Sequence, residues 1–399
     1  MTTHPGFSSW MEYILHLEGQ ASEVDDPRAE HDVHMEAARL WEERYLQKAK
    51  AIVHYQQAFK ADSASRPALA EARRIYWEMG RIGTLERIIG LELEIAGEDA
   101  ERAALLRELA EALAILGDGE RARAALEQAV ELDDGDARSR ELLADLSAGE
   151  EWAERAAQLE EAADGAEGAA AADLLYRAAG LQRLGGAGFE AIEPLLRRAE
   201  TADPFHRGAA FLCERGLVEA EREDDLARFH GELLQDADDR AALMDELGRR
   251  WLLWHGNPDR ALPFLDQAFR ADPSLPGILG FLYEAYREAG DTNAAADLVE
   301  AGLERAEGEH RTDLLEVAGD LWWRVIGDAA QAARYFDELR RIDPESATAR
   351  LFFEENEMTH DPDSDSKRDE ADEEAAEETS EEREAEASEA TGGDEAPED

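Results

Sequence analysis

The side chains that could carry out chemistry are plentiful in this sequence, but few stand at spacings that a reaction or a metal site requires. His31 and His34 lie three residues apart and could share one face of a helix, yet no third ligand is spaced to complete a metal site. Cys213 is the single cysteine, and no catalytic context surrounds it. We interpret the histidines as part of a solvated polar face and Cys213 as a small buried hydrophobic residue.

No phosphate-binding loop can be identified. No series of glycines ends in Gly-Lys-Ser or Gly-Lys-Thr, and Gly-Gly-Ala-Gly at 185–188 follows no strand pattern, so we interpret it as a turn between helices. Acidic residues number 95, and among so many any pair can be found at catalytic spacing. The sequence therefore predicts a protein that is not an enzyme and that uses no cofactor and no metal.

Charge and composition exclude several classes of protein. The 399 residues carry 95 acidic and 42 basic side chains, a net charge of −53, which disfavours nucleic acid because phosphate binding needs clustered lysine and arginine. One cysteine excludes an internal disulfide framework and fits a reducing compartment. The sequence has no run of about 18 apolar residues and no positively charged leader, so we expect a cytoplasmic protein without a membrane partner.

The segments that must position any site are helical. Up to residue 358, apolar residues recur every three or four positions, and no stretch shows sustained period-2 alternation. Two kinds of break alternate along this region. In one kind, glycine precedes an Asp or Asn that can cap the next helix, as at 117–118, 256–257, 290–291 and 327–328. In the other, Asp precedes a proline that cannot continue the helix, as at 203–204, 272–273 and 343–344.

The alternating breaks define a repeat. Residues early in the second helix of each pair lie 34 to 37 positions apart. These residues are Ala122, Ala156, Ala191, Leu226, Ala261, Ala295 and Ala332. A helix pair of this length cannot bury its apolar face alone, so successive pairs must stack on one another.

The repeat resembles the tetratricopeptide family. The best unit has the small, aromatic and proline positions of that family at Leu247-Gly248, Trp251, Ala261, Leu265, Ala268 and Pro273. The resemblance implies an all-α fold, a right-handed superhelical solenoid of stacked antiparallel helix pairs, in which Gly248 and Ala261 let the two helices approach closely. We expect about nine pairs over residues 31–358, a capping helix and loop over 1–30, and a disordered acidic tail over 359–399.

The resemblance also implies a function and a set of site residues. Tetratricopeptide arrays hold a peptide or protein segment in a concave groove lined by the first helix of each pair. The protein is therefore expected to be a non-catalytic scaffold or adaptor. Its groove candidates are Arg107, Glu111, Tyr176, Arg183, Asp245, Arg249, Leu252, Glu284, Arg287, Glu316, Asp320 and Trp323. The alternative interpretation for each charged residue is a solvated helix face.

The acidity favours a partner segment that is basic or contains arginine, because long-range attraction raises the encounter rate. Adaptation to a salty cytosol is an alternative origin of the same charge. The lysines and asparagines that clamp a chaperone carboxylate in some arrays are absent, since only Lys48, Lys50 and Lys60 precede the tail. Two other functions remain open, a self-assembling structural protein and a regulatory subunit or enzyme of unrecognised type, and so does the oligomeric state.

The tail supplies a first prediction. From residue 359 onward the sequence has 19 acidic and 3 basic residues and no Leu, Ile, Val or aromatic residue, so it cannot offset its conformational entropy by burial. Truncation after Met358 should leave the melting temperature nearly unchanged in a circular dichroism melt. A loss of several degrees would contradict this and would mean that the tail docks onto the body.

Overall fold

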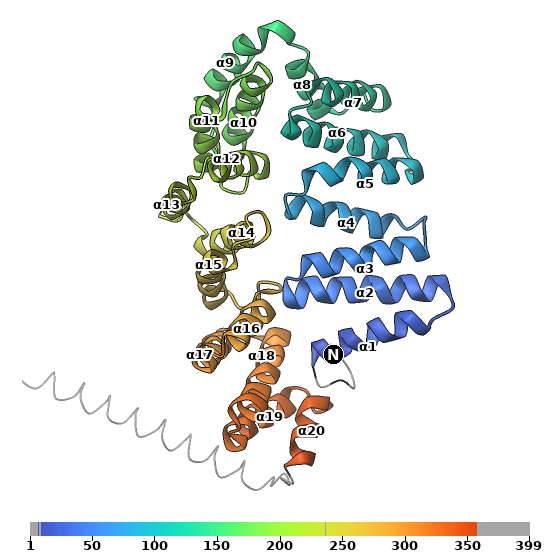
Figure 1. Ribbon diagram of the computed structural model, residues 1–399, viewed down its shortest axis with the longest axis vertical. Coiled ribbons are helices and arrows are strands. Elements are labelled where there is room, and N and C mark those ends of the chain that lie inside the picture. Colours follow the sequence, from blue (N-terminus) through green and yellow to red (C-terminus); the bar gives the residue numbers. More distant parts are fainter. Residues whose placement is uncertain (1–6, 8, 236, 357–399) are drawn as a thin grey trace, which may run out of the picture.

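A computed structural model describes residues 7, 9–235 and 237–356 of the chain. Every regular element in these ranges is a helix (Figure 1). Besides a 3-10 turn at Gly149–Glu151 and a π-helical segment at Leu321–Ile326 there are twenty α-helices. They are α1 (Trp10–Glu23), α2 (Pro27–Tyr45), α3 (Lys48–Ala61), α4 (Arg66–Glu78), α5 (Ile82–Ile95), α6 (Asp99–Leu116), α7 (Gly119–Leu132), α8 (Ala137–Leu146), α9 (Trp152–Ala163), α10 (Gly168–Leu184), α11 (Phe189–Ala202), α12 (Arg207–Glu219), α13 (Glu223–Leu233), α14 (Arg240–Leu253), α15 (Pro258–Ala271), α16 (Ile278–Ala289), α17 (Thr292–Leu303), α18 (Gly308–Asp320), α19 (Ala329–Ile342) and α20 (Ala347–Glu355).

The helices form successive pairs, from α2 with α3 to α18 with α19, and each pair packs on the next. The expected fold class, an all-α solenoid of stacked helix pairs, is confirmed for the described residues. Helix α1 packs on α2, and α20 packs on α18 and α19 at the other end. The expected boundary at residue 30 falls inside α2, which begins at Pro27. The expected tail, 359–399, lies outside the described residues.

The joints within pairs have the predicted chemistry. Gly117 ends α6 with a φ of +87°, a left-handed conformation that glycine adopts without strain. The Asp118 side chain then accepts a hydrogen bond of 3.1 Å from the backbone N–H of Arg121, which caps α7. The joint between α12 and α13 has no glycine, and there Glu221 takes the left-handed conformation with a φ of +59°.

The structure corrects the repeat register at two points. Ala191 is exposed, and the buried residue at the fourth position of α11 is Ile192, as Ala122 is at the fourth position of α7. A Cβ atom at Gly248 would lie 2.7 Å from the Leu265 side chain, so the close contact of Gly248 is with Leu265 rather than with Ala261.

Ion pairs between equivalent positions of successive repeats tie the stack together. Arg66 Nη1 lies 3.1 Å from Glu101 Oε2, and Arg138 Nη1 lies 2.7 Å from Asp173 Oδ2, in each case with a separation of 35 residues. Because the period of the repeat is about the same, residues 35 apart occupy the same place on neighbouring pairs. The same separation relates Arg73 to Glu108 and Arg121 to Glu86. An acidic chain thus uses its arginines where they face carboxylates of the next repeat.

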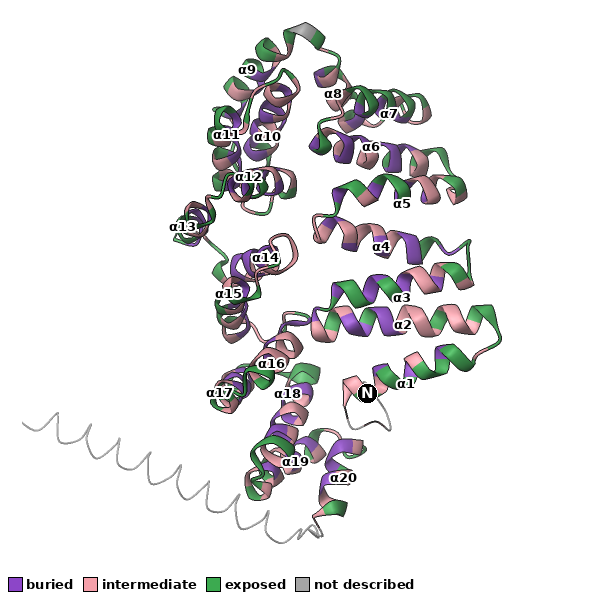
Figure 2. Ribbon diagram, in the orientation of Figure 1, coloured by how far each residue is buried: buried purple, intermediate pink, exposed green. Residues whose placement is uncertain are grey.

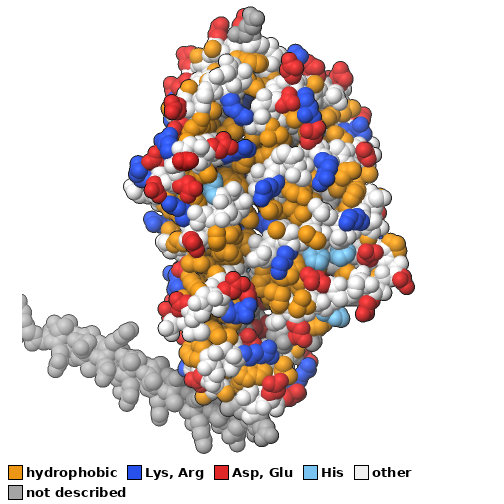
Figure 3. All heavy atoms as spheres, in the orientation of Figure 1, with side chains coloured by type: hydrophobic (Ala, Val, Ile, Leu, Met, Phe, Trp, Pro, Cys, Tyr) orange, Lys and Arg blue, Asp and Glu red, His pale blue; other side chains and the backbone are white. Residues whose placement is uncertain are grey.

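The solenoid is bent so that its two halves face each other. Helices α1 to α8, here called the first arm, rise along one side, and α9 to α20, the second arm, return along the other (Figure 1). Buried residues follow the faces where helices meet, and exposed ones cover the outside (Figure 2). Figure 3 shows hydrophobic side chains gathered along the seam between the arms.

Two glycines bring the arms into backbone contact at this seam. A Cβ atom at Gly280 in α16 would lie 2.0 Å from the carbonyl oxygen of Arg44 in α2. One at Gly277, whose φ is +78°, would lie 2.8 Å from the carbonyl oxygen of Glu42. No residue other than glycine fits at Gly280 without moving one arm away from the other.

An aromatic contact closes the seam between the end of α14 and the joint of α4 with α5. Trp254, at the end of α14, donates a hydrogen bond of 2.8 Å from Nε1 to the carbonyl oxygen of Glu78 in α4. Phe211 of α12 packs edge-on against Trp254, with ring centroids 5.5 Å apart. Gly80 lies beneath both rings, and a Cβ atom there would be 2.8 Å from Phe211. The joint between α4 and α5 therefore serves also as a docking point for the second arm.

Charged residues are buried directly behind Trp254. Glu214 of α12, which has no exposed surface, accepts hydrogen bonds from Arg250 Nη1 at 3.0 Å and from the ring of His255 at 2.7 Å. Burial alone would raise the pKa of Glu214, but the charges of His230 and Arg250 outweigh burial and lower it. The Arg250 guanidinium also lies over the Trp254 ring, 5.2 Å from its centroid. The cluster thus holds in place the residue that closes the seam.

Glu200 of α11 is the poorly satisfied member of this cluster. Its side chain is fully buried, and among the described residues no N–H or O–H group donates a hydrogen bond to either carboxyl oxygen, although the Cys213 thiol is a neighbour and Arg250 Nη1 lies 3.5 Å away. Burial and the neighbouring Glu214 carboxylate raise the pKa of Glu200 to about 8. The carboxyl group therefore stays protonated in the folded chain at a pH where it is ionised in the unfolded chain.

We expect Gly280→Ala to separate the arms, because its methyl group would meet backbone atoms. The free energy of unfolding should fall by about 1–3 kcal/mol, as for other overpacked contacts, and small-angle scattering should report a larger radius of gyration. Gly90→Ala in α5 is the matched control, since a Cβ atom there meets nothing within 4 Å. The control should keep its dimensions and gain about 0.5–1 kcal/mol in stability. Equal effects of the two substitutions would contradict the role of Gly280.

We expect Glu200→Gln to stabilise the protein increasingly as pH rises. The folded state binds more protons than the unfolded state between the ordinary glutamate pKa and about 8, so the wild-type chain loses stability across that range. Glutamine mimics the protonated form. The variant should therefore exceed the wild type by at least about 1 kcal/mol at pH 9 and by little at pH 5 in denaturant titrations. Glu214→Gln should destabilise at both pH values, because it removes the negative charge that compensates the buried Arg250 guanidinium. A loss of stability in Glu200→Gln at pH 9 would refute this assignment.

Candidate functional site

Two of the larger cavities of the inner groove lie on either side of the contact between the arms. The upper cavity, of about 760 Å³, lies between α4, α6 and α8 of the first arm and α10 and α12 of the second. The lower cavity, of about 540 Å³, lies between α1 and α2 of the first arm and α16, α18 and the π-helical segment of the second. Both volumes are in the range of sites that hold several side chains of a ligand.

Charged side chains in the wall of the upper cavity neutralise one another. Arg73 Nε lies 2.6 Å from Glu92 Oε2, and Arg73 also donates to Glu108. Arg138 makes two hydrogen bonds to Asp173, at 2.7 and 2.5 Å. Each guanidinium is held by its partner, so the wall presents fixed donors and acceptors of both signs.

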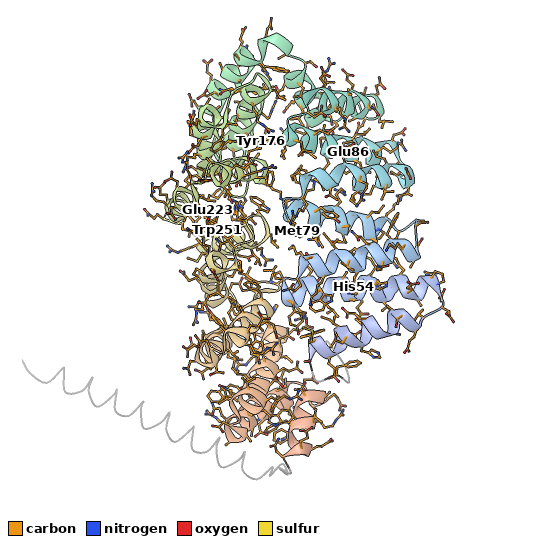
Figure 4. The ribbon with its side chains drawn as sticks, in the orientation of Figure 1. His54, Met79, Glu86, Tyr176, Glu223 and Trp251 are labelled. Atoms are coloured by element: carbon orange, nitrogen blue, oxygen red, sulfur yellow. The ribbon has the colours of Figure 1, made fainter. Side chains whose placement is uncertain are left out.

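Three of the predicted groove residues meet at the upper cavity. They are Arg107 and Glu111 from α6 and Tyr176 from α10. Arg107 is paired with Asp136, the residue that caps α8. Figure 4 shows Tyr176 in the second arm on the side that faces the first. Burial raises the pKa of Tyr176, so its hydroxyl stays a hydrogen-bond donor at neutral pH. A Cβ atom at Gly208 would lie 2.7 Å from the Tyr176 ring, so glycine lets α12 lie directly against it.

The negative charge of Glu111 is poorly balanced by neighbouring cations. Its nearest cationic atom is Arg138 Nε at 3.9 Å, beyond hydrogen-bond distance. The side chain is 37% exposed, but it lies between the upper cavity and a small adjoining recess of about 60 Å³. Burial raises the pKa of Glu111, and the charges of Arg138 and Arg107 offset this only in part. A cationic or hydrogen-bond-donating ligand group would therefore be favoured beside it.

Four more predicted residues meet at the lower cavity. They are Glu284 and Arg287 from α16 and Glu316 and Asp320 from α18. The residues that the first arm contributes are not among the predicted ones, because no sequence spacing links residues 10 and 44 to residue 313. Trp10 Nε1 donates to Asp313 at 3.3 Å, Arg44 pairs with the same carboxylate, and the Arg44 guanidinium lies 4.0 Å from the centroid of the Trp10 ring.

The remaining predicted residues serve the structure rather than either cavity. Arg183 donates a hydrogen bond of 2.7 Å from Nη1 to the carbonyl oxygen of Ile115, so it bridges the two arms. Arg249 pairs with Asp245 and donates to the carbonyl oxygen of Pro276 at 2.8 Å. Leu252 lines a smaller recess at the seam beside Met79, which Figure 4 labels there.

The prediction for Trp323 is corrected by the structure. Its ring packs edge-on against Phe336 and Phe352, with centroids 6.2 and 5.2 Å away, and so belongs to the core at the end of the stack. The cause is local: residues 321–326 are π-helical, and the wider turn changes which side chains face the groove. Val325 of this segment reaches the lower cavity instead.

Within the described ranges, no group of three or more His, Cys, Asp or Glu residues could hold a metal ion. His34 and His54 lie 3.1 Å apart through their Nδ1 atoms, but they form a pair without a third ligand. No described helix is both long enough and apolar enough to cross a membrane.

No protein-family model matches the chain, and no curated protein matches it in sequence. Solved structures similar to it include Naa15/Naa10 bound to HypK-THB, at 14% identity over 88% of this chain, with a TM-score of 0.28. This chain spans 59% of the length of that one. The P58(IPK) TPR domain is 12% identical over 82% of this chain and 99% of that chain, with a TM-score of 0.25. A human IFIT1 dimer with m7Gppp-AAAA is 12% identical over 84% of this chain and 68% of that chain, with a TM-score of 0.24.

The fold is established by the contacts of the chain itself. Gly248 meets Leu265, and Gly319 meets Phe336, where the two helices of a pair touch. Ala122 and Ala261 are fully buried at equivalent positions of their pairs. These recurring contacts make the described part of the chain a tetratricopeptide-like helical solenoid.

Proposed function

We propose that the protein is a non-catalytic scaffold that binds a segment of a partner protein between its two arms. The observation that carries this proposal is the upper cavity, because it is built from both arms and gathers residues more than 60 positions apart, such as Arg107 and Tyr176. A segment bound there would contact both arms at once. A cytoplasmic setting belongs to the same proposal and is supported by the single cysteine.

The wall of the cavity suits a peptide. Its charged groups are paired and therefore held in place, so they can accept and donate hydrogen bonds without being reordered on binding. Phe205, which is 50% exposed, and the exposed Arg207 lie at the rim, where they are available to a ligand. Glu111 offers a partly exposed carboxyl group with a raised pKa, beside which a hydrogen-bond donor is favoured. The net charge of −53 supports a protein partner over a nucleic acid.

The test uses the full chain and a random library of displayed peptides. Selected peptides should lose about 10-fold or more in affinity for Phe205→Ala, because an aromatic hot spot at an interface contributes about 2 kcal/mol or more and about 1.4 kcal/mol is tenfold. Val53→Ala is the matched control, since Val53 is 52% exposed on α3 and lies at neither cavity. Fluorescence anisotropy gives the dissociation constants. Failure to select any peptide whose affinity depends on Phe205 or Glu111 would overturn the proposal.

A further inference from the structure

The lower cavity differs from the upper one in its closure. The contacts of Trp10 and Arg44 with Asp313 join the beginning of the first arm to α18. Behind them the cavity is enclosed by Tyr45 of α2 and by the loop that precedes α16. The N-terminal helix is thus part of the wall of a site and does more than cover the end of the stack.

The inner surface of the lower cavity is largely apolar. Leu279 and Tyr283 of α16 and Val317 of α18 contribute to it, together with Val325 from the π-helical segment. Val325 is 41% exposed and adds apolar surface at the edge of the cavity. Burial raises the pKa of Tyr283 to about 12, so its phenol remains a neutral donor. An apolar side chain entering here would remove this surface from water.

Carboxylates outnumber cations around this apolar surface. Five acidic residues line the lower cavity, against three arginines. The acidic residues are Glu43, Glu284, Asp313, Glu316 and Asp320, and the arginines are Arg44, Arg287 and Arg324. The upper cavity shows the opposite balance, with five arginines and four glutamates in its lining.

Two of these carboxylates pair with exposed arginines three or four residues further along the chain. Asp320 pairs with Arg324 at 3.1 Å, and Arg324 is 43% exposed. Burial raises the pKa of Asp320, and the neighbouring Glu316 adds to this against the charge of Arg324. Glu284 accepts two hydrogen bonds from Arg287, three residues further along the same helix, at 3.2 Å from Nε and 2.5 Å from Nη2. A cation supplied from outside would meet carboxylates in an apolar enclosure, where such pairs are stronger than in water.

We propose that the lower cavity is a second binding site, which accepts a partner segment carrying an arginine or lysine next to a large apolar side chain. The apolar surface takes the apolar side chain, and Glu284 and Asp320 take the cation. The overall charge of −53 draws such a segment toward the protein. This inference rests on one part of the proposed function, namely that a protein segment binds between the arms. It adds the chemistry of the partner and a separate place for it.

The same charges disfavour anionic occupants. Residues 359–399, with 19 acidic and 3 basic side chains, would bring like charges to the rim of the lower cavity. Residues 1–6 precede Ser9 and Trp10 in the cavity wall, and they are tested as an alternative occupant.

The probe is a fluorescein-labelled octapeptide, Gly-Ser-Arg-Leu-Trp-Arg-Ser-Gly, titrated against the full chain. One comparison peptide has glutamate in place of both arginines, and another has glycine in place of Leu and Trp. We expect both to bind at least 10-fold more weakly than the probe. Binding of the probe should weaken as the salt concentration rises. Equal binding of the glutamate peptide would overturn the proposal.

Val325→Arg tests the location, because it adds a positive charge at the rim without disturbing a buried residue. Probe affinity should fall at least 10-fold, while Val53→Arg, the same change at a similarly exposed valine on α3, should have no effect. Asp320→Asn is the second variant and should weaken the probe even if Val325→Arg does not fold. Circular dichroism melts verify the folding of each variant. Probe affinity that is unchanged by both rim variants would overturn the assignment to this cavity.

Other occupants give distinct results. If deletion of residues 1–6 raises probe affinity 10-fold or more, the chain itself fills the cavity and the proposal is wrong. Displacement of the probe by an equal concentration of spermine would show that a small cation suffices, which also overturns it. Phe205→Ala should leave probe affinity unchanged. If library peptides bind in a way that depends on Phe205 but the probe does not bind, only the inference about the lower cavity is refuted. If the probe binds but no library peptide depends on Phe205 or Glu111, only the proposal for the upper cavity is refuted.

Discussion

The contact between the C-terminal end of α2 and the start of α16 determines the shape of everything that faces the groove. It depends on Gly277 and Gly280, which let one backbone lie directly against another. An open solenoid would present a continuous concave surface. Because the arms meet here, the surface is divided into two cavities, and each cavity is walled by helices that are distant in sequence.

The buried charges behind Trp254 support this closure. Placing Glu214, Arg250 and His230 in the core carries a desolvation cost, which their mutual hydrogen bonds offset only if the geometry is retained. The cluster links α12, α13 and α14 and directs Trp254 toward the first arm. Glu200 remains the weak point, since among the described residues no N–H or O–H group donates a hydrogen bond to its carboxyl group. The seam is therefore held by a network whose protonation state matters.

The use of arginine explains how so acidic a chain can stack tightly. Its arginines stand about one period from carboxylates, as in the pairs of Arg66 with Glu101 and Arg138 with Asp173. Each repeat thereby neutralises part of its neighbour. The side chains that line the lower cavity are not balanced in this way, because acidic residues outnumber arginines there. The two cavities thus differ in charge although they share one groove.

The sequence by itself determined the helices, their joints and the period of the repeat. These depend on short-range signals: apolar spacing, a glycine before a capping residue as at Gly117 and Asp118, and proline after a helix end. The period also places arginine and carboxylate one repeat apart. The repeat pattern also predicted Arg107, Glu111 and Tyr176 as groove residues, and in the structure these three line the upper cavity.

Only the tertiary structure decided which inner faces meet. The rotation between successive helix pairs is small, and no single pair encodes the sum of these rotations along the stack. That sum brings α16 to α2 and Trp10 to Asp313, and it turns Arg183 from a groove residue into a bridge between the arms. The position of Trp323 was decided by the π-helical turn at residues 321–326, because the α-helical period read from the sequence does not predict this wider turn.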